Sequence, residues 1–141
     1  MPRVDFHSQV SDSLHYTCRL VRKARAAHCN IIIYSDDDAA LACLDEQLWS
    51  FSASDFLPHS YLDDANAPVT PIILTKDLQA NLPHRQILIN LSRELPTNYQ
   101  EFERVIEIVS TDPTDAQAAR QRFRQYQHEG IQPSHTVAST T

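Results

Sequence analysis

The chain has 141 residues, of which 42% are hydrophobic and 21% are charged, and its formal net charge is −6 at pH 7. These values are typical of one globular domain and exclude a chain that is disordered along most of its length. The acidic balance also disfavours an autonomous DNA- or RNA-binding domain, because such domains usually carry a basic excess that neutralises phosphates.

Hydrophobic patterns of strand type and helix type alternate along the chain. Val4 and Phe6 alternate with polar residues as in a strand, whereas Leu14, Cys18 and Val21 recur as on one face of a helix. In chain order, the predicted elements are a strand at 3–7, a helix from 11–13 to 28, a strand at 30–34, a helix from 36–38 to 49, a long ordered loop at 50–70, strands at 71–75 and 86–90, a helical turn at 97–103, a strand at 104–110 and a helix at 112–129. This order predicts an α/β fold with a mostly parallel sheet flanked by helices.

The last predicted helix has clear boundaries. Asp112 is a capping acid, Pro113 suits the first helical position, and Gly130 suits a left-handed residue at the end. We expect a single domain over residues 1–130, followed by a polar, flexible tail at 131–141.

Several protein classes are excluded or disfavoured by what the sequence lacks. The chain contains one glycine, so the glycine-rich loops that bind nucleotide phosphates are excluded. No apolar run reaches the roughly 18–20 residues of a membrane-spanning helix, and the first residues lack a signal-peptide core, so we expect a cytoplasmic protein. The cysteines form no C-x-x-C pair and are expected to be buried, reduced thiols; they are Cys18, Cys29 and Cys43.

No catalytic or metal site stands out. The seven histidines are scattered, and neither H-E-x-x-H nor a nucleophile elbow occurs, so we predict no cofactor and no metal. The acidic run Asp36, Asp37 and Asp38 follows a predicted strand. It is typical of a capped helix start, and a magnesium site of a small hydrolase is the alternative.

The last helix and the centre of the chain suggest binding rather than catalysis. Arg120 and Arg124 lie four residues apart on one helix face, beside Phe123. Guanidinium groups next to aromatic surface suit a carboxylate on an apolar side chain, although an arginine-rich helix face can also be simply solvated. The aromatic residues in the middle of the chain, Trp49, Phe51 and Phe56, either fill the core or line a partner pocket.

Two stretches carry a family resemblance. The sequence LDEQLW at residues 44–49, followed by FLPH at 56–59, resembles the signature of the chi subunit of bacterial DNA polymerase III. Further similar blocks lie at residues 85–91, 102–109 and 119–126. The resemblance covers most of residues 3–130.

This resemblance implies a non-catalytic accessory subunit with a Rossmann-like fold that lacks the glycine loop. Such subunits join the clamp-loader complex through the psi subunit. They also bind the acidic, Phe-terminated C-terminal tail of the single-stranded-DNA-binding protein, so that contact with DNA runs through the protein coat. The resemblance places the tail pocket at Trp49, Phe56, Val109, Arg120, Phe123 and Arg124.

Two positions depart from the family pattern. Ala116 stands where a lysine is often found, and Phe123 replaces the usual tyrosine. The first change removes a charge contact, and the second keeps the ring but loses a hydroxyl. Two other functions stay open at this point: a stand-alone module for another acidic peptide, and a small metal-dependent hydrolase that uses Asp36 to Asp38.

Overall fold

The computed structural model describes residues 2–51 and 56–138. Its strands are β1 (Arg3–Val10), β2 (Ile31–Tyr34), β3 (His59–Tyr61), β4 (Ile72–Thr75), β5 (Ile87–Asn90), β6 (Arg104–Ser110) and β7 (Ser134–Val137). Its α-helices are α1 (Ser13–Ala26), α2 (Asp38–Ser50) and α3 (Pro113–His128), and short 3₁₀ helices lie at Ala67–Val69 and Tyr99–Glu101. None of the helices in these two segments is long and apolar enough to cross a bilayer.

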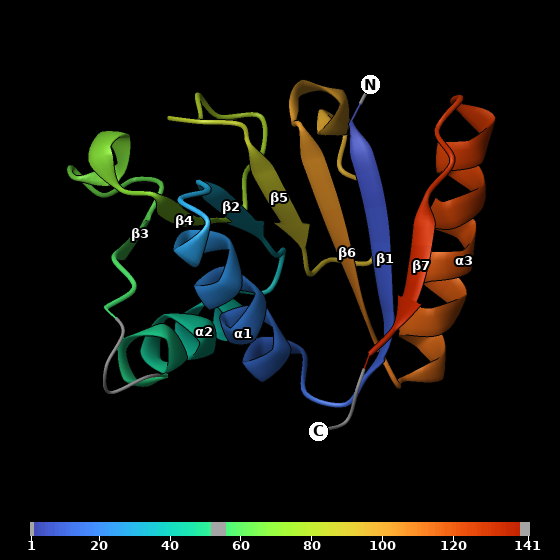
Figure 1. Ribbon diagram of the computed structural model, residues 1–141, viewed down its shortest axis with the longest axis horizontal. Helices are drawn as coiled ribbons and strands as arrows, with labels where there is room; N and C mark the ends of the chain where they lie inside the picture. The colour runs from blue at the N-terminus through green and yellow to red at the C-terminus, as the bar shows by residue number, and fades with distance from the viewer. Residues whose placement is uncertain (1, 52–55, 139–141) are drawn as a thin grey trace.

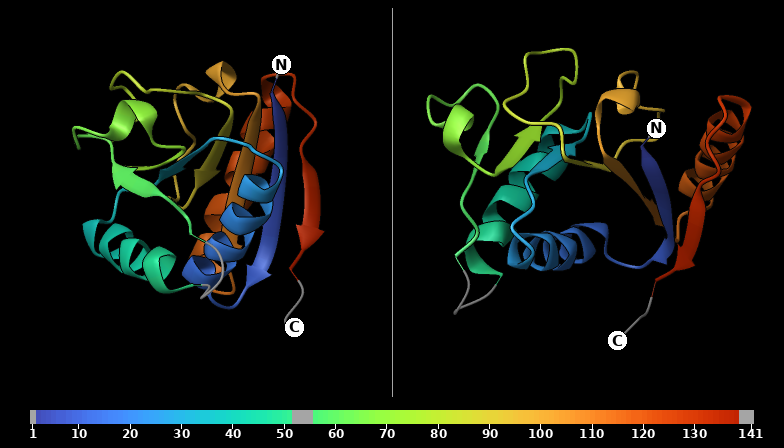
Figure 2. Two further views of the ribbon diagram at one scale, coloured as in Figure 1. Left: turned by 60° about the vertical axis from the view of Figure 1, so that its left-hand side comes forward. Right: turned by 45° about the horizontal axis from the view of Figure 1, so that its top comes forward.

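The strands form one parallel sheet in the order β3-β4-β2-β5-β6-β1-β7. Helices α1 and α2 cover one face of the sheet, and α3 covers the other (Figures 1 and 2). This architecture confirms the predicted α/β fold with helices on both faces of a parallel sheet.

The central strands are buried on both faces, which explains their unbroken apolar runs. In β2, Ile31 and Ile33 pack in the cluster that includes Cys18, Val21 and Leu44 of the α1 and α2 layer. Ile32 points the opposite way, into the cluster that contains residues of α3. Successive side chains of one strand therefore fill two separate cores.

Aspartate side chains cap the three α-helices. Asp12 accepts a hydrogen bond from the backbone N–H of His15, and Asp37 and Asp112 do the same at the starts of α2 and α3. Gly130, just after α3, has φ 94°, a conformation that glycine adopts without steric cost. The predicted boundaries of the last helix are thus confirmed.

The sequence-based prediction misses two strands. β3 lies within the predicted loop at 50–70, and β7 lies within the predicted tail at 131–141. β7 pairs with β1, and Ile131 just before it is buried. The domain therefore extends through at least Ala138, and the predicted boundary at residue 130 is wrong; the end of the predicted tail, 139–141, lies outside the described residues. Both strands are short edge strands, so neither shows an apolar alternation.

The cysteines are free, but they are not all buried as predicted. Cys18 is buried, Cys29 is half-buried and Cys43 is exposed. Burial, with smaller contributions from Asp12 and Cys43, raises the pKa of the Cys18 thiol to about 12. This thiol is therefore protonated at neutral pH and behaves as a small apolar core residue.

Candidate partner-binding site

A groove of about 710 Å³ runs along α3, between this helix, the ends of β1 and β6, and β7. Its lining combines apolar and polar side chains, namely Phe6, Ser8, Val109, Ala116, Ala119, Arg120, Phe123 and His135, together with three polar residues at the ends of β1 and β6. We call it the α3 groove.

The floor of the α3 groove is apolar. Val109 is buried at the end of β6, and Phe123 is half-buried on α3. The ring of Phe123 packs at a tilt against the ring of Phe6, with 5.2 Å between centroids. Ala116, where the family often has a lysine, presents only a methyl group to the groove. The result is an apolar surface that suits an aromatic or aliphatic side chain.

The three arginines of α3 have different environments. Arg120 is exposed and lines the groove. Arg124 is exposed one turn further along the helix and does not line the groove. Arg122 points away from the groove, because its Nε donates to the buried Glu107 at 3.1 Å and its Nη1 donates to the Arg93 carbonyl at 2.8 Å. One of the three arginines is therefore positioned to pair with an anion in the groove.

Glu107 is the centre of a buried polar network that the sequence analysis missed. Asn90 and Tyr126 donate to its carboxylate at 2.8 and 2.7 Å, in addition to Arg122. Burial raises the pKa of Glu107, and the charge of Arg122 and the three hydrogen bonds act in the opposite direction. The detectable signal was an isolated acid inside the apolar run of β6, because such an acid needs a buried partner.

Trp49 and Phe56 form a second, exposed feature. Their relative exposures are 56% and 74%, and their rings lie 5.8 Å apart. Trp49 also packs on the ring of His59, at 4.2 Å between centroids. His59 is held by hydrogen bonds to the Leu57 carbonyl at 2.7 Å and to the Asp45 carboxylate at 2.8 Å. Trp49 and Phe56 are therefore exposed, and Trp49 packs on a histidine ring whose position hydrogen bonds fix.

The six predicted site residues do not line one pocket. Trp49 and Phe56 belong to the region of α2 and β3, at one end of the sheet, whereas the α3 groove lies at the β1–β7 end. The two helices also cover opposite faces of the sheet (Figures 1 and 2). The residues of the tail pocket that the resemblance implies are therefore divided between two separate surfaces, since sequence similarity carries no information on which face of a sheet each helix covers.

Comparison with known proteins identifies the family of this chain. A family model described as "DNA polymerase III chi subunit, HolC" matches residues 1–134. The chain belongs to this family.

Relatives named DNA polymerase III subunit chi support the assignment. The protein from Pseudomonas aeruginosa is 38% identical over 135 residues, which cover 92% of each chain. Those from Haemophilus influenzae and Escherichia coli are 29% and 24% identical, over 80% and 81% of this chain and 78% of each relative. The resemblance is confirmed, and the chain is an accessory subunit of a replicative DNA polymerase.

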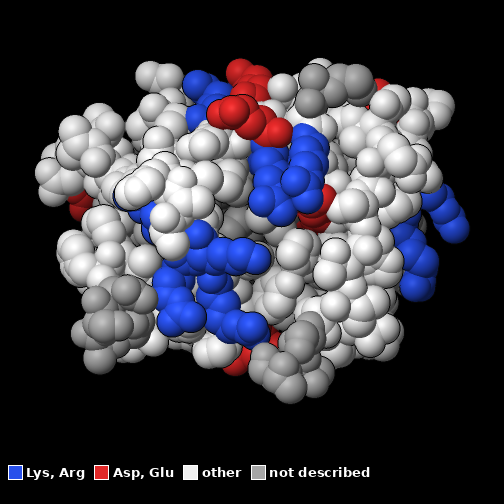
Figure 3. Space-filling model, in the orientation of Figure 1, with Lys and Arg blue, Asp and Glu red and all other residues white. Residues whose placement is uncertain are grey.

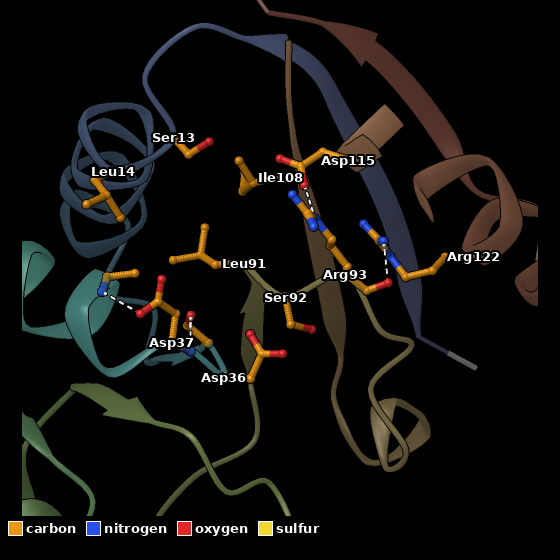
Figure 4. Close-up of a pocket in the computed structure, with 12 residues that line it drawn as sticks. Ser13, Leu14, Asp36, Asp37, Leu91, Ser92, Arg93, Ile108, Asp115 and Arg122 are labelled. Carbon is orange, nitrogen blue, oxygen red and sulfur yellow. Dashed lines mark hydrogen bonds and ion pairs between the residues drawn. The ribbon is translucent and has the colours of Figure 1, made fainter. Parts of the chain in front are cut away.

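A cavity of about 460 Å³ at the carboxyl ends of the strands tests the hydrolase alternative (Figure 4). Such crevices often bind ligands in open α/β sheets. Here, however, Asp37 caps α2, and Asp38 forms an ion pair with Lys76 at 3.2 Å. Within residues 2–51 and 56–138, no three His, Cys, Asp or Glu side chains are grouped as metal ligands would be. The structure therefore assigns Asp37 to helix capping and Asp38 to a surface ion pair, whereas Asp36 lines the cavity.

Sequence reasoning also missed part of the groove wall. Phe6 and Ser8 come from β1, and His135 comes from β7, in the segment that was expected to be a tail. His135 Nε2 and Ser8 Oγ lie 2.5 Å apart, within hydrogen-bond distance. His135 enters the site only because β7 pairs with β1.

Proposed function

We propose that this chain is a non-catalytic chi subunit that links the psi subunit to the C-terminal tail of the single-stranded-DNA-binding protein. It would do so within the clamp-loader complex, in the cytoplasm at the replication fork. The observation that carries this proposal is the α3 groove, which combines the exposed Arg120 with an apolar floor in a member of the chi family.

The chemistry of the α3 groove matches that of the tail. The tail ends in a phenylalanine that bears a free carboxylate, and aspartates precede it. The guanidinium of Arg120 binds the terminal carboxylate, and the phenylalanine ring packs against Val109 and Phe123. Arg124, one turn along α3, adds attraction for the aspartates. A short peptide bound in this way has an affinity on the order of micromolar, or about −8 kcal/mol.

The exposed Trp49 and Phe56 pair is assigned to the psi subunit. Exposed aromatic side chains are frequent centres of protein interfaces. Because this pair and the α3 groove lie at opposite ends of the sheet, both partners are accommodated at once. A linking subunit requires two separate surfaces, and this arrangement provides them.

Several tails on one DNA-bound protein strengthen the attachment. A second tail binds at the effective concentration set by its tether, so avidity rises without new contacts. Because charge pairs contribute to each contact, the binding weakens as salt rises.

The proposal is tested by fluorescence anisotropy with a labelled peptide that matches the tail, at low and high salt. We expect salt-sensitive binding that weakens at least about tenfold in Arg120→Ala and in a peptide without its terminal phenylalanine. Trp49→Ala should bind the peptide as wild type does and fail to retain psi in a pull-down. Absence of peptide binding by the folded wild-type chain would overturn the tail assignment, and unchanged psi binding in Trp49→Ala would overturn the psi assignment.

An unrelated acidic peptide without a terminal aromatic residue is the specificity control. Equal affinity for this peptide and for the tail would favour the alternative of a general acidic-peptide module. We expect much weaker binding, because the apolar floor of the α3 groove contributes only when an apolar side chain fills it.

A further inference from the structure

Helix α1 carries a concentration of positive charge that the proposed function does not use. Its sequence, SLHYTCRLVRKARA, contains no acidic residue and holds four of the 12 lysines and arginines of the chain. Arg19, Arg22 and Lys23 are exposed, whereas Arg25 is half-buried and donates to the Cys29 carbonyl. In a chain of net charge −6, this helix is a local exception.

The exposed cations share one face of α1 and border a hollow. Arg19, Arg22 and Lys23 are spaced three and four residues apart, so they are neighbours on the helix surface. Together with His7 and Tyr16 they line a groove of about 540 Å³ between α1 and β1. Figure 3 shows the basic side chains gathered over α1 beside this hollow. We call this surface the α1 basic face.

The charges of the α1 basic face are not neutralised within the described part of the chain. No ion pair among residues 2–51 and 56–138 involves Arg19, Arg22 or Lys23, whereas Lys76 and Arg93 have carboxylate partners. The guanidinium of Arg22 lies 5.2 Å from the centroid of the Phe51 ring, and this cation–π contact does not neutralise its charge.

The pKa of the neighbouring His7 reflects the same positive charge. Burial lowers the pKa of His7, which forms part of the groove lining, and the nearby charges of Arg104 and Lys23 act in the same direction, against that of Asp5. Positive charge therefore reaches the groove from both α1 and β6.

We propose that the α1 basic face binds the phosphodiester backbone of single-stranded DNA. The three exposed cations contact successive phosphates. The rings of Tyr16 and Phe51, both half-buried beside these cations, offer surface for the bases. Net charge argued against direct contact with DNA, but net charge is an average, and the local distribution of charge decides where a polyanion binds.

An acidic peptide is a poorer match for this surface. Peptide ligands usually depend on an apolar anchor in a pocket, as in the α3 groove. The groove along α1 is lined mainly by charged and polar side chains. Nucleic acid needs no such anchor, because phosphate neutralisation supplies most of its non-specific affinity.

The test uses the full chain and a fluorescein-labelled oligothymidylate of about 20 nucleotides, followed by anisotropy at about 20 mM and about 200 mM NaCl. We expect weak binding at low salt, with a slope of log affinity against log salt near about −2 for three phosphate contacts. The triple variant Arg19→Ala/Arg22→Ala/Lys23→Ala should bind at least about tenfold more weakly. Its fold is checked by thermal melting and by retained binding of the tail peptide.

A matched control removes one charge elsewhere. Lys76→Ala deletes an exposed cation outside the α1 basic face, and it should leave oligonucleotide affinity within about twofold, whereas Arg19→Ala should weaken it several-fold. Equal losses in the two variants, or no loss in the triple variant, would overturn the assignment to α1. No binding by wild type at low salt would overturn it as well.

Two competitors test the class of ligand. A polyglutamate peptide that displaces the oligonucleotide at equal charge concentration would overturn the assignment in favour of an acidic peptide. A duplex of the same length that binds more tightly than the single strand would overturn the single-strand assignment. Failure of tail-peptide binding leaves this inference intact, since the two ligands are titrated separately and bind different elements.

Discussion

The Nε of Arg122 on α3 donates to Oε1 of Glu107 on β6 across 3.1 Å, with only 5% and 0% of the two side chains exposed. This pair connects the last helix to the sheet through the core. It therefore sets the rotation of α3 about its axis, and that rotation directs Arg120 and Phe123 into the groove.

Glu107→Gln should lower the free energy of unfolding by about 3–5 kcal/mol, because it leaves the Arg122 charge buried without a counter-charge. Arg122, Asn90 and Tyr126 all donate to the Glu107 carboxylate. In the glutamine variant, the side-chain NH₂ group is itself a donor, so it faces one of these donors without a hydrogen bond. Urea denaturation measures the change. The double variant Glu107→Gln/Arg122→Met should recover part of the loss, and a single-variant loss below about 1 kcal/mol would contradict a structural role for the pair.

Arg120→Ala should weaken binding of the tail peptide more than Arg124→Ala, although both remove one exposed arginine from α3. Arg120 lines the groove, whereas Arg124 lies outside it and acts through longer-range attraction. We expect the affinity for the peptide to fall roughly tenfold or more in Arg120→Ala and about two- to threefold in Arg124→Ala. The smaller effect, that of Arg124→Ala, should disappear first as salt rises. Isothermal titration at two salt concentrations separates the two effects, and equal losses at high salt would contradict this geometry.

Stability should fall in acid partly through Asp5. Burial raises the pKa of Asp5, but hydrogen bonds from Ser134 and Arg104, the charge of Arg104 and a hydrogen bond from Arg3 outweigh burial and hold the pKa below its ordinary value of 3.8. A carboxyl whose folded-state pKa is lowered stabilises the fold above the unfolded-state pKa, and this contribution is lost as pH falls through the folded-state pKa.

The measurement for Asp5 is the free energy of unfolding from about pH 6 down to about pH 2, for wild type and Asp5→Asn. The difference between the two proteins should be largest at the upper end and shrink below about pH 4. Burial raises the pKa of Asp115, but hydrogen bonds from Ser110 and Arg93 and the charge of Arg93 outweigh burial and lower this pKa. The stability of the Asp5→Asn variant therefore still falls in acid, through Asp115. A difference that stays constant with pH would show that Asp5 contributes by packing alone.

Removal of β7 should weaken both the fold and the tail-peptide affinity. Chain termination after Gly130 deletes the buried Ile131, the Ser134 hydroxyl that donates to Asp5, and His135 on the wall of the α3 groove. We expect a lower melting temperature and at least several-fold weaker peptide binding. Ser134→Ala, which removes one hydrogen bond and keeps the strand, is the control and should reduce stability by about 1 kcal/mol without changing peptide affinity. If the shortened chain is as stable as the full chain, the folded domain ends at residue 130 as the sequence predicts.

The elements that the sequence predicted well are those whose pattern is local. A helix that buries one face repeats its apolar residues every three or four positions, and α1 and α3 follow this rule after a capping aspartate. The central strands show continuous apolar runs because helices cover both faces of the sheet. Edge strands have no such requirement, and β3 and β7 are therefore recognisable only from their pairing with β4 and β1.

The candidate site divides in the same way. From the sequence alone came the residue types: the arginines and Phe123 of the last helix, the aromatic Trp49 and Phe56, and the family to which they point. The tertiary structure decided how these residues are grouped, because Arg122 turns inward to Glu107 while Arg120 faces the groove, and because α2 and α3 cover opposite faces of the sheet. Residue types follow from the order of the chain, whereas the direction of a side chain depends on which distant segment its element packs against.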